Sequence, residues 1–243
     1  VGDTGVLEAE GVSVDVVDTT KHEGVYLHRA VVGEGTLNVG DKLTAKVDSL
    51  RRSAIMRNHT AAHLLQAALR KVLGTHVEQA GQLVNDQHVR FDFTHFSALT
   101  PEELVQVESL VNEEILKAVP VSMVEMGIEE ARQSGAMALF GEKYGDVVRV
   151  VSVEDGFSKE LCGGTHMDNT ARLGLFKIVS ESSVASGVRR IEGVTGTGVL
   201  EMLGVQMATL RQTAQAMKVA NPMELPLHAG QMMAQIKDKD KLI

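Results

Sequence analysis

The chain has 243 residues, with 24 Lys or Arg and 32 Asp or Glu, and its formal net charge is −8. This length provides one large domain or two modest ones, and an apolar content of 44% excludes a wholly disordered chain. The negative charge argues against a nonspecific coat on nucleic acid. A single cysteine excludes a disulfide within the chain, so we expect a cytoplasmic protein. No run approaches the roughly 18 apolar residues of a membrane helix, so we expect no membrane partner.

The negative charge is concentrated in two blocks of the sequence. Residues 1–50 carry a net charge of −5 and residues 101–150 a net charge of −6. Residues 51–100 carry +3, residues 151–200 carry −1 and residues 201–243 carry +1. The candidate site residues described below lie outside both acidic blocks.

The first fifty residues alternate short β-type segments with glycine-containing turns. Residues 12–17, 24–28 and 42–47 have the composition of strands. Several short strands at this spacing predict a small β-barrel or sandwich. We therefore expect an N-terminal β-barrel subdomain over residues 1–50.

The pattern changes at about residue 51 to one that mixes helices and strands. A helical stripe runs to Leu73 with Gly74 as its stop, and a second helix is predicted from the Thr100-Pro101-Glu102-Glu103 start signal. Strands are predicted at residues 82–84, 88–93, 147–153, 175–180 and 188–194. The fold class is therefore α+β, with an α/β domain over residues 51–198. Residues 199–243 are rich in Met, Leu and Ala and predict two packing helices broken at residues 221–222.

Two histidines on the first predicted helix have the spacing of a metal chelate. His59 and His63 are four residues apart, which places them about 40° apart around the helix axis and about 6 Å along it. Two imidazoles in this arrangement can bind one metal ion. Two unrelated helix histidines would have the same spacing, so the pair does not decide the matter alone.

A second cluster, at residues 162–166, contains the only cysteine. Cys162 and His166 repeat the four-residue separation, and the intervening Gly163 and Gly164 permit a tight loop with inward-pointing backbone N–H groups. One thiolate and three imidazoles are an ordinary tetrahedral Zn²⁺ set, and the thiolate disfavours Mg²⁺ or Ca²⁺. We therefore predict one zinc ion per chain, with the four ligands His59, His63, Cys162 and His166.

These residues leave the chemistry of the zinc open. Thr60 stands where the metalloprotease H-E-x-x-H pattern has Glu, and the motif of nucleobase deaminases is absent. With four bound ligands the shell is closed and the zinc organises structure. With one ligand weak or released, a water molecule could bind and become a nucleophile.

Two adjacent arginines, Arg189 and Arg190, stand at the start of a predicted strand. They have the chemistry of a clamp for phosphate or carboxylate. A surface ion pair with Glu192 explains the same residues, and the spacing alone slightly favours the ion pair.

Taken together, the motifs resemble the editing domain of bacterial alanyl-tRNA synthetases, which is related to the editing domain of threonyl-tRNA synthetases. The resemblance covers nearly the whole chain. It rests on residues 59–65, 73–77, Gln79 with Gly81 and Leu83-Val84, and residues 90–93, 135–144 (GAMALFGEKY), 162–166 (CGGTH) and 187–196. The CGGTH string, the upstream H-x-x-x-H and GAMALFGEKY together are highly specific.

The resemblance implies an aminoacyl-tRNA deacylase that hydrolyses tRNA(Ala) wrongly charged with serine or glycine. A binding pocket that selects alanine rejects serine and glycine poorly. A second site that hydrolyses the wrongly charged product corrects the error, an arrangement known as a double sieve. A water molecule would attack the ester near the zinc, with help from the terminal hydroxyl of the tRNA. No protein general base is assigned.

The resemblance also implies roles for the residues around the zinc. Thr60 would sense the serine hydroxyl, and Gln79 would line the pocket. Gly163 and Gly164 would let the aminoacyl adenosine approach the backbone. The two arginines, Arg189 and Arg190, would help to hold the site or the RNA. Ala62, Ala80 and Gln82 replace the Thr, Lys and Ser that are common in the family, and none of these three is a predicted ligand.

The same resemblance predicts a fragment that lacks the ATP-dependent aminoacylation core of alanine–tRNA ligase. Its C-terminal helices resemble the start of a linker, so tight tRNA binding would need the rest of the synthetase in cis. Three alternatives share some of these features. They are a free-standing editing protein of this family, a threonyl-type editing domain (for which we expect proline in place of Gly164-Thr165) and a noncatalytic tRNA-binding module with structural zinc.

Overall fold

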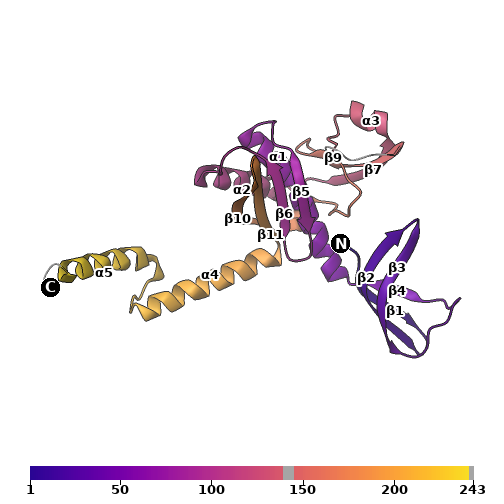
Figure 1. Ribbon diagram of the computed structural model, residues 1–243, viewed down its shortest axis with the longest axis horizontal. Helices are drawn as coiled ribbons and strands as arrows, with labels where there is room; N and C mark the ends of the chain where they lie inside the picture. The colour runs from indigo at the N-terminus through magenta and orange to yellow at the C-terminus, as the bar shows by residue number, and fades with distance from the viewer. Residues whose placement is uncertain (139–144, 241–243) are drawn as a thin grey trace. The chain divides into compact units, whose positions relative to one another are not determined.

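The computed structural model describes residues 1–138 and 145–240, and the chain divides into two compact units, Val1–Gly196 and Thr197–Ile243 (Figure 1). Part of the motif at residues 135–144 therefore lies outside the described residues. The division of the first unit at residue 50, which the sequence predicts, stays a prediction.

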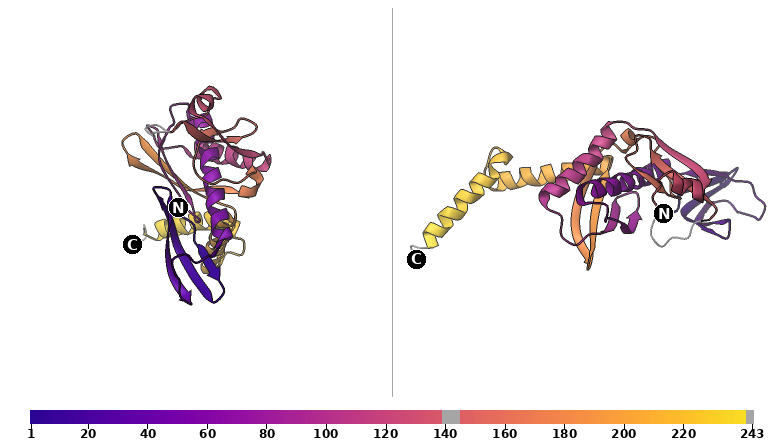
Figure 2. Two further views of the ribbon diagram at one scale, coloured as in Figure 1. Left: turned by 90° about the vertical axis from the view of Figure 1, so that its right-hand side faces the viewer. Right: turned by 90° about the horizontal axis from the view of Figure 1, so that it is seen from above.

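The N-terminal sheet is an open antiparallel sheet with the strand order β3-β2-β1-β4. Its strands are β1 (Gly5–Ala9), β2 (Val12–His22), β3 (Val25–Glu34) and β4 (Thr44–Val47). The predicted closed barrel is wrong, because among the described strands β3 pairs with β2 alone and β4 with β1 alone (Figure 2). A barrel requires its two edge strands to pair, and here both edges stay open.

The first helix, α1 (Ser49–Leu73), confirms the predicted helical stripe and carries two of the predicted ligands. The Asp48 side chain caps its N-terminus by accepting from the N–H of Arg51. Gly74 ends it with a φ of 114°, a conformation that favours glycine. Leu64 and Leu65 are fully buried on its inner face.

The second sheet is antiparallel, with the strand order β10-β11-β6-β5, and it forms the main core with α1 and α2 (Figure 1). Phe91, Phe93 and Ile191 point from its central strands into that core and have no exposed surface. The predicted capping box is confirmed, because Thr100 and Glu103 cap α2 reciprocally. The elements are β5 (Gln79–Val84), β6 (Val89–Thr94), α2 (Pro101–Leu116), β10 (Phe176–Ala185) and β11 (Val188–Thr195).

A third sheet, with the order β7-β8-β9, delivers the second ligand cluster. Its strands are β7 (Val121–Gly127), β8 (Val147–Val153) and β9 (Lys159–Leu161), with the short helix α3 (Ile128–Gln133) between β7 and β8 and η1 (Thr170–Leu173) after β9. The strand β9 ends at Leu161, so residues 162–166 leave the sheet directly as a loop.

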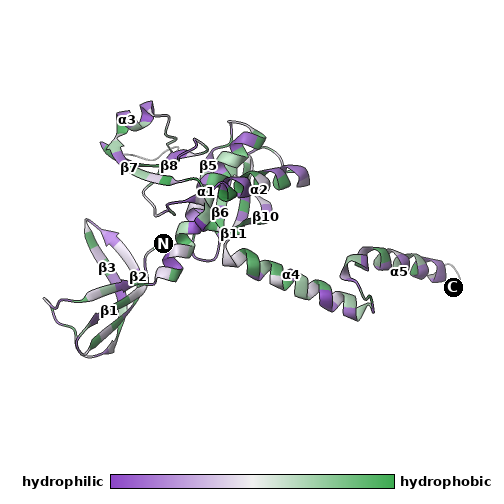
Figure 3. Cartoon of the chain, turned by 180° about the vertical axis from the view of Figure 1, so that it is seen from behind, coloured by the Kyte–Doolittle hydropathy of each residue, from purple (hydrophilic) through white to green (hydrophobic). Residues whose placement is uncertain are grey.

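The C-terminal unit contains α4 (Thr197–Ala216), η2 (Pro222–Glu224) and α5 (Leu225–Asp240). A small cluster of Ala214, Val219 and Leu225 packs around the bend between the two long helices. Hydrophobic residues recur along α4 (Figure 3), and several of them, such as Leu200 and Val205, are exposed. None of the described helices is both long enough and apolar enough to cross a membrane.

Alanine substitutions of two phenylalanines, one in β6 and one just after it, test whether the buried core provides most of the stability. Phe91 has no exposed surface, whereas Phe96 is 82% exposed. We expect Phe91→Ala to lower the free energy of unfolding by about 3–5 kcal/mol, because it leaves a core cavity. Phe96→Ala should cost about 1 kcal/mol or less. Urea denaturation measures both, and similar costs would contradict this assignment of the core.

Candidate metal centre

The helix α1 and the loop after β9 bring the four predicted ligands together. His59, His63, Cys162 and His166 each present one ligand atom, and these atoms all lie within 4.8 Å of one another. His63 and His166 are buried, while His59 and Cys162 are half-buried. The cluster is therefore closed toward the core and open on one side.

The distances within the cluster fit a small tetrahedral ion. Cys162 Sγ lies 3.5 Å from His59 Nε2 and 3.3 Å from His166 Nε2. Ordinary zinc–sulfur and zinc–nitrogen bond lengths at a tetrahedral angle place such atoms about 3.6 Å apart. The arrangement could therefore hold a metal ion without a large rearrangement of the ligands.

The protonation states of the imidazoles also suit a metal. Burial, with a contribution from His63, lowers the pKa of His59 to about 3. Burial lowers the pKa of His63 to about 4, and burial together with the neighbouring histidines strongly lowers the pKa of His166. All three rings are therefore neutral at pH 7 and keep a free lone pair, as metal ligation requires.

Gly164 allows the loop to approach the helix closely enough to complete the set. A Cβ on this residue would lie 1.9 Å from Cε1 of the His59 ring, whereas a Cβ on Gly163 would meet nothing within 4 Å. The two glycines therefore differ in their function. Gly164 leaves the space that the His59 ring occupies, and Gly163 faces open space.

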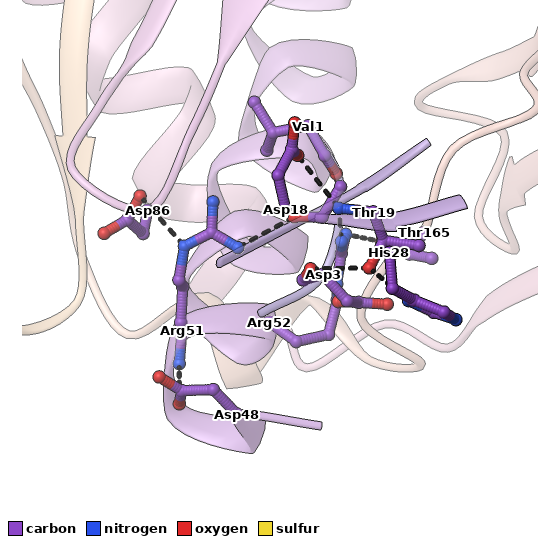
Figure 4. A network of polar contacts seen from close by, with 11 residues as sticks. Val1, Asp3, Asp18, Thr19, His28, Asp48, Arg51, Arg52, Asp86 and Thr165 are labelled. Carbon is purple, nitrogen blue, oxygen red and sulfur yellow. Dashed lines mark hydrogen bonds and ion pairs between the residues drawn. The ribbon is translucent and has the colours of Figure 1, made fainter. Parts of the chain in front are cut away.

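Two arginines hold the loop in place. Arg149 on β8 donates to the carbonyl oxygens of Cys162 (3.0 Å) and Gly164. Arg52 on α1 donates to Thr165 Oγ1 at 2.9 Å and pairs with Asp3 at 2.6 Å (Figure 4). The loop is thus tied both to its own sheet and to the helix that provides the other two ligands.

The Nδ1 atoms of the two buried histidines face side-chain oxygens. His166 Nδ1 lies 3.3 Å from Thr60 Oγ1. His63 Nδ1 lies 3.6 Å from Glu160 Oε2 and has no hydrogen-bond partner among the described residues. This orientation leaves both Nε2 atoms for a metal, as is usual when a second group holds the other ring nitrogen. Burial raises the pKa of Glu160 to about 7.

The position of Thr60 differs from the one that the resemblance implies. The residue is 1% exposed, and its hydroxyl donates to Met56 O and accepts from Met167 N. With His166 Nδ1 these contacts use its one donor and both acceptor sites. A hydrogen bond to a substrate would therefore break contacts that are already made, and the geometry favours a supporting role behind His166.

The open side of the cluster faces a cavity of about 660 Å³. His59, Gly163, Gly164 and Thr165 form its wall on the metal side, and Gln82 on β5 lies beside them. Gln82 Nε2 is 3.5 Å from His59 Nε2. The opposite wall comes from the N-terminal sheet, so the cavity lies between two parts of the first unit.

The other predicted site residues lie away from this cavity. Gln79 is half-buried at the start of β5, opposite Phe93, and is not among the residues that line the cavity. Arg189 pairs with Glu181 at 2.6 Å, and Arg190 donates to both oxygens of Asp92 at 2.6 and 2.8 Å. Both arginines form ion pairs within the sheet, but with Glu181 and Asp92 and not with Glu192, the partner that the ion-pair interpretation names.

Sequence reasoning missed several contributors to the site. Glu160 stands two residues before Cys162, but its contact with His63 depends on how β9 lies against α1. Arg149 and Arg52 give no signal in the sequence beyond their charge, since their partners are 13 and 113 residues away. Gln82 stands out in the sequence only as a departure from the family pattern. Of these residues, only Glu160 could have been suspected from the sequence, because it is a charged residue close to the ligand Cys162.

Comparison with known proteins shows which sequences this chain is similar to. The sequence profile of the threonyl and alanyl tRNA synthetase second additional domain matches residues 148–192. The alanine–tRNA ligase of Acetivibrio thermocellus is 53% identical over 100% of this chain and 28% of its own length. Those of Bacillus subtilis and Geobacillus thermodenitrificans are each 50% identical, over 99% and 98% of this chain and 27% of their own lengths.

Residues 148–192 are therefore similar to the additional domain of threonyl- and alanyl-tRNA synthetases. Along its whole length the chain is similar to one segment of alanine–tRNA ligases, as the sequence motifs predict. It spans little more than a quarter of the length of the curated relatives that it matches.

The two adjacent glycines provide a matched test of the centre. We expect Gly164→Ala to weaken Zn²⁺ binding by at least about tenfold, since the new methyl group collides with the His59 ring. Gly163→Ala should bind zinc as the parent chain does. Competition with a chromogenic chelator measures both affinities, and equal affinities would contradict the close approach of the loop to the ring.

The oxygens behind the buried histidines provide a second test. Replacing Glu160 by Leu or Thr60 by Val removes the group that faces an Nδ1 atom, and we expect each to weaken zinc affinity about 10–100-fold. Glu160→Gln keeps an oxygen in place and should restore much of the loss. If Thr60→Val leaves zinc affinity unchanged but slows only serine release, Thr60 contacts the substrate instead.

Proposed function

We propose that this chain is a zinc-dependent deacylase that hydrolyses tRNA(Ala) mischarged with serine or glycine. The observation that carries the proposal is the Cys/His cluster opening on a cavity, in a chain about half identical to a segment of alanine–tRNA ligases. Ligation of alanine is the activity named for those relatives. A cytoplasmic location, which the single cysteine suggests, stays a prediction.

The donor set supports zinc as the ion. A thiolate disfavours hard cations such as Mg²⁺, and three neutral imidazoles with one thiolate suit tetrahedral Zn²⁺. When bound, zinc would supply a Lewis acid that polarises the carbonyl of the aminoacyl ester. The half-buried His59 lines the cavity from which a substrate would approach.

The protein would contribute binding of the aminoacyl group beside the metal. Gly163 and Gly164 both line the cavity, and Gly163 faces open space, so an aminoacyl group can reach the backbone beside Gly163. The Gln82 amide lies beside His59 and is positioned to hydrogen-bond a small polar group. The buried His63 and His166 close the opposite side of the cluster to solvent.

The choice of serine and glycine as substrates follows from how poorly an alanine-binding pocket rejects them before the tRNA is charged. A pocket for alanine cannot strongly reject glycine or serine, since each differs from alanine by one small group. A second site that hydrolyses the wrong ester corrects this. The substrate-binding roles suggested for Gln79, Arg189 and Arg190 stay predictions, and Gln82 is the better-placed amide.

One observation favours a second candidate, a noncatalytic tRNA-binding module with structural zinc. Four protein ligands are enough to close a tetrahedral shell, and structural sites are typically closed in this way. A free-standing editing protein would share the site and the reaction of the first candidate.

Deacylation assays separate these candidates. We expect the purified chain to contain about one zinc per chain and to hydrolyse Ser-tRNA(Ala) and Gly-tRNA(Ala) while sparing Ala-tRNA(Ala). A chelator should abolish the hydrolysis, and Cys162→Ala should lower both zinc content and rate. Circular dichroism of the variant checks that it is folded.

Two outcomes would contradict the proposal. Hydrolysis no faster than in buffer, with zinc present, would favour the noncatalytic module. Full zinc occupancy in the folded Cys162→Ala variant would remove this cysteine from the ligand set.

A further inference from the structure

The cavity beside the metal centre has a second wall that belongs to the N-terminal sheet. Thr19, Thr20 and Lys21 at the end of β2, and Tyr26 at the start of β3, line it opposite His59 and Gly164. Its volume of about 660 Å³ is larger than a seryl or glycyl group needs. The sheet therefore faces the part of a ligand that lies beyond the amino acid.

This second wall is held to the metal centre by polar contacts (Figure 4). Arg51 donates to Gly2 O at 2.9 Å, and Arg52 bridges Asp3 and Thr165. Thr19 Oγ1 donates to Asp3 O at 2.9 Å, which links β2 to the same segment. The hairpin tip is therefore positioned relative to α1 and to the loop that carries Cys162.

The side chains of this wall have the chemistry that recognises a nucleotide. Tyr26 is 63% exposed, and Lys21 Nζ lies 5.1 Å from the centre of its ring. An exposed aromatic ring stacks on a base of any sequence, and an adjacent ammonium binds a phosphate. Among the charged side chains that line the cavity, Asp3 is paired with Arg52, so Lys21 leaves a net positive charge.

We propose that Tyr26 and Lys21 form a binding subsite for the terminal nucleotide of an RNA 3′ end, with Tyr26 under the base and Lys21 at a phosphate. The identification of the ligand as a tRNA end rests on the proposed function. The subsite itself rests on the cavity and on its two walls. In this arrangement the chain binds RNA despite its negative net charge, because Lys21 and Tyr26 at the end of the β2–β3 hairpin provide a local positive charge and an aromatic ring.

Binding of uncharged RNA tests the subsite without any hydrolysis. The probes are two fluorescent RNA microhelices with the acceptor-stem sequence of tRNA(Ala), one ending in CCA and one lacking the final adenosine. We expect the zinc-loaded chain to bind the CCA form about fivefold or more tightly, which is the contribution of one stacked base. Tyr26→Ala should abolish this preference, and Tyr26→Phe should keep it.

The same titrations, repeated at several salt concentrations, test Lys21. Losing one phosphate contact on single-stranded RNA should reduce the slope of log affinity against log salt by about 0.7, so we expect this change in Lys21→Met. Leu27 and Lys42 are exposed residues of the N-terminal region that do not line the cavity. Leu27→Ala and Lys42→Met are therefore the matched controls, expected to behave as the parent chain.

The outcomes distinguish this inference from the proposed deacylation. If the chain prefers the CCA form through Tyr26 but hydrolyses no ester, the subsite stands and the proposed function fails. If hydrolysis occurs but the preference is absent, or persists in the folded Tyr26→Ala variant, the subsite is overturned.

Discussion

The close approach of the 162–166 loop to the His59 ring is the contact on which the rest of the site depends. A helix alone can provide His59 and His63, but a tetrahedral ion needs two more ligands from another direction. Gly164 allows the loop to approach from that direction, because the His59 imidazole occupies the space that a side chain at residue 164 would need. The same approach opens the cavity, since one face of His59 and the backbone of Gly163 and Gly164 become its wall.

Charge is organised around this contact at short range. Arg149 donates to two backbone carbonyl oxygens of the half-buried part of the loop, which would otherwise be poorly satisfied, and Arg52 adds a contact to the exposed Thr165 hydroxyl. Burial keeps the three imidazoles neutral, so the cluster carries little repulsion before an ion binds. The net charge of −8 is a property of the whole chain, and it does not represent the local charge around the candidate metal centre.

Local elements were predictable where short-range rules decide them. The stripe of α1, its Gly74 stop and the capping box of α2 depend on neighbours within about four residues, and each was found as predicted. The strand β7 was missed because it forms by pairing with β8, about 25 residues further along the chain. The closed barrel failed for a similar reason, since closure depends on whether two distant edges meet.

The sequence by itself determined the fold class, the α1 helix and the identity of the four candidate ligands, because a chelate pair on one helix and a Cys-His loop are each set by the spacing of near neighbours. Only the tertiary structure decided which groups stand behind and beside those ligands. Glu160, Thr60 and Gln82 acquire their positions through contacts between α1, β5 and the loop after β9, and the wall bearing Tyr26 comes from a separate sheet. Such contacts join residues far apart in the chain, and residue spacing carries no information about them.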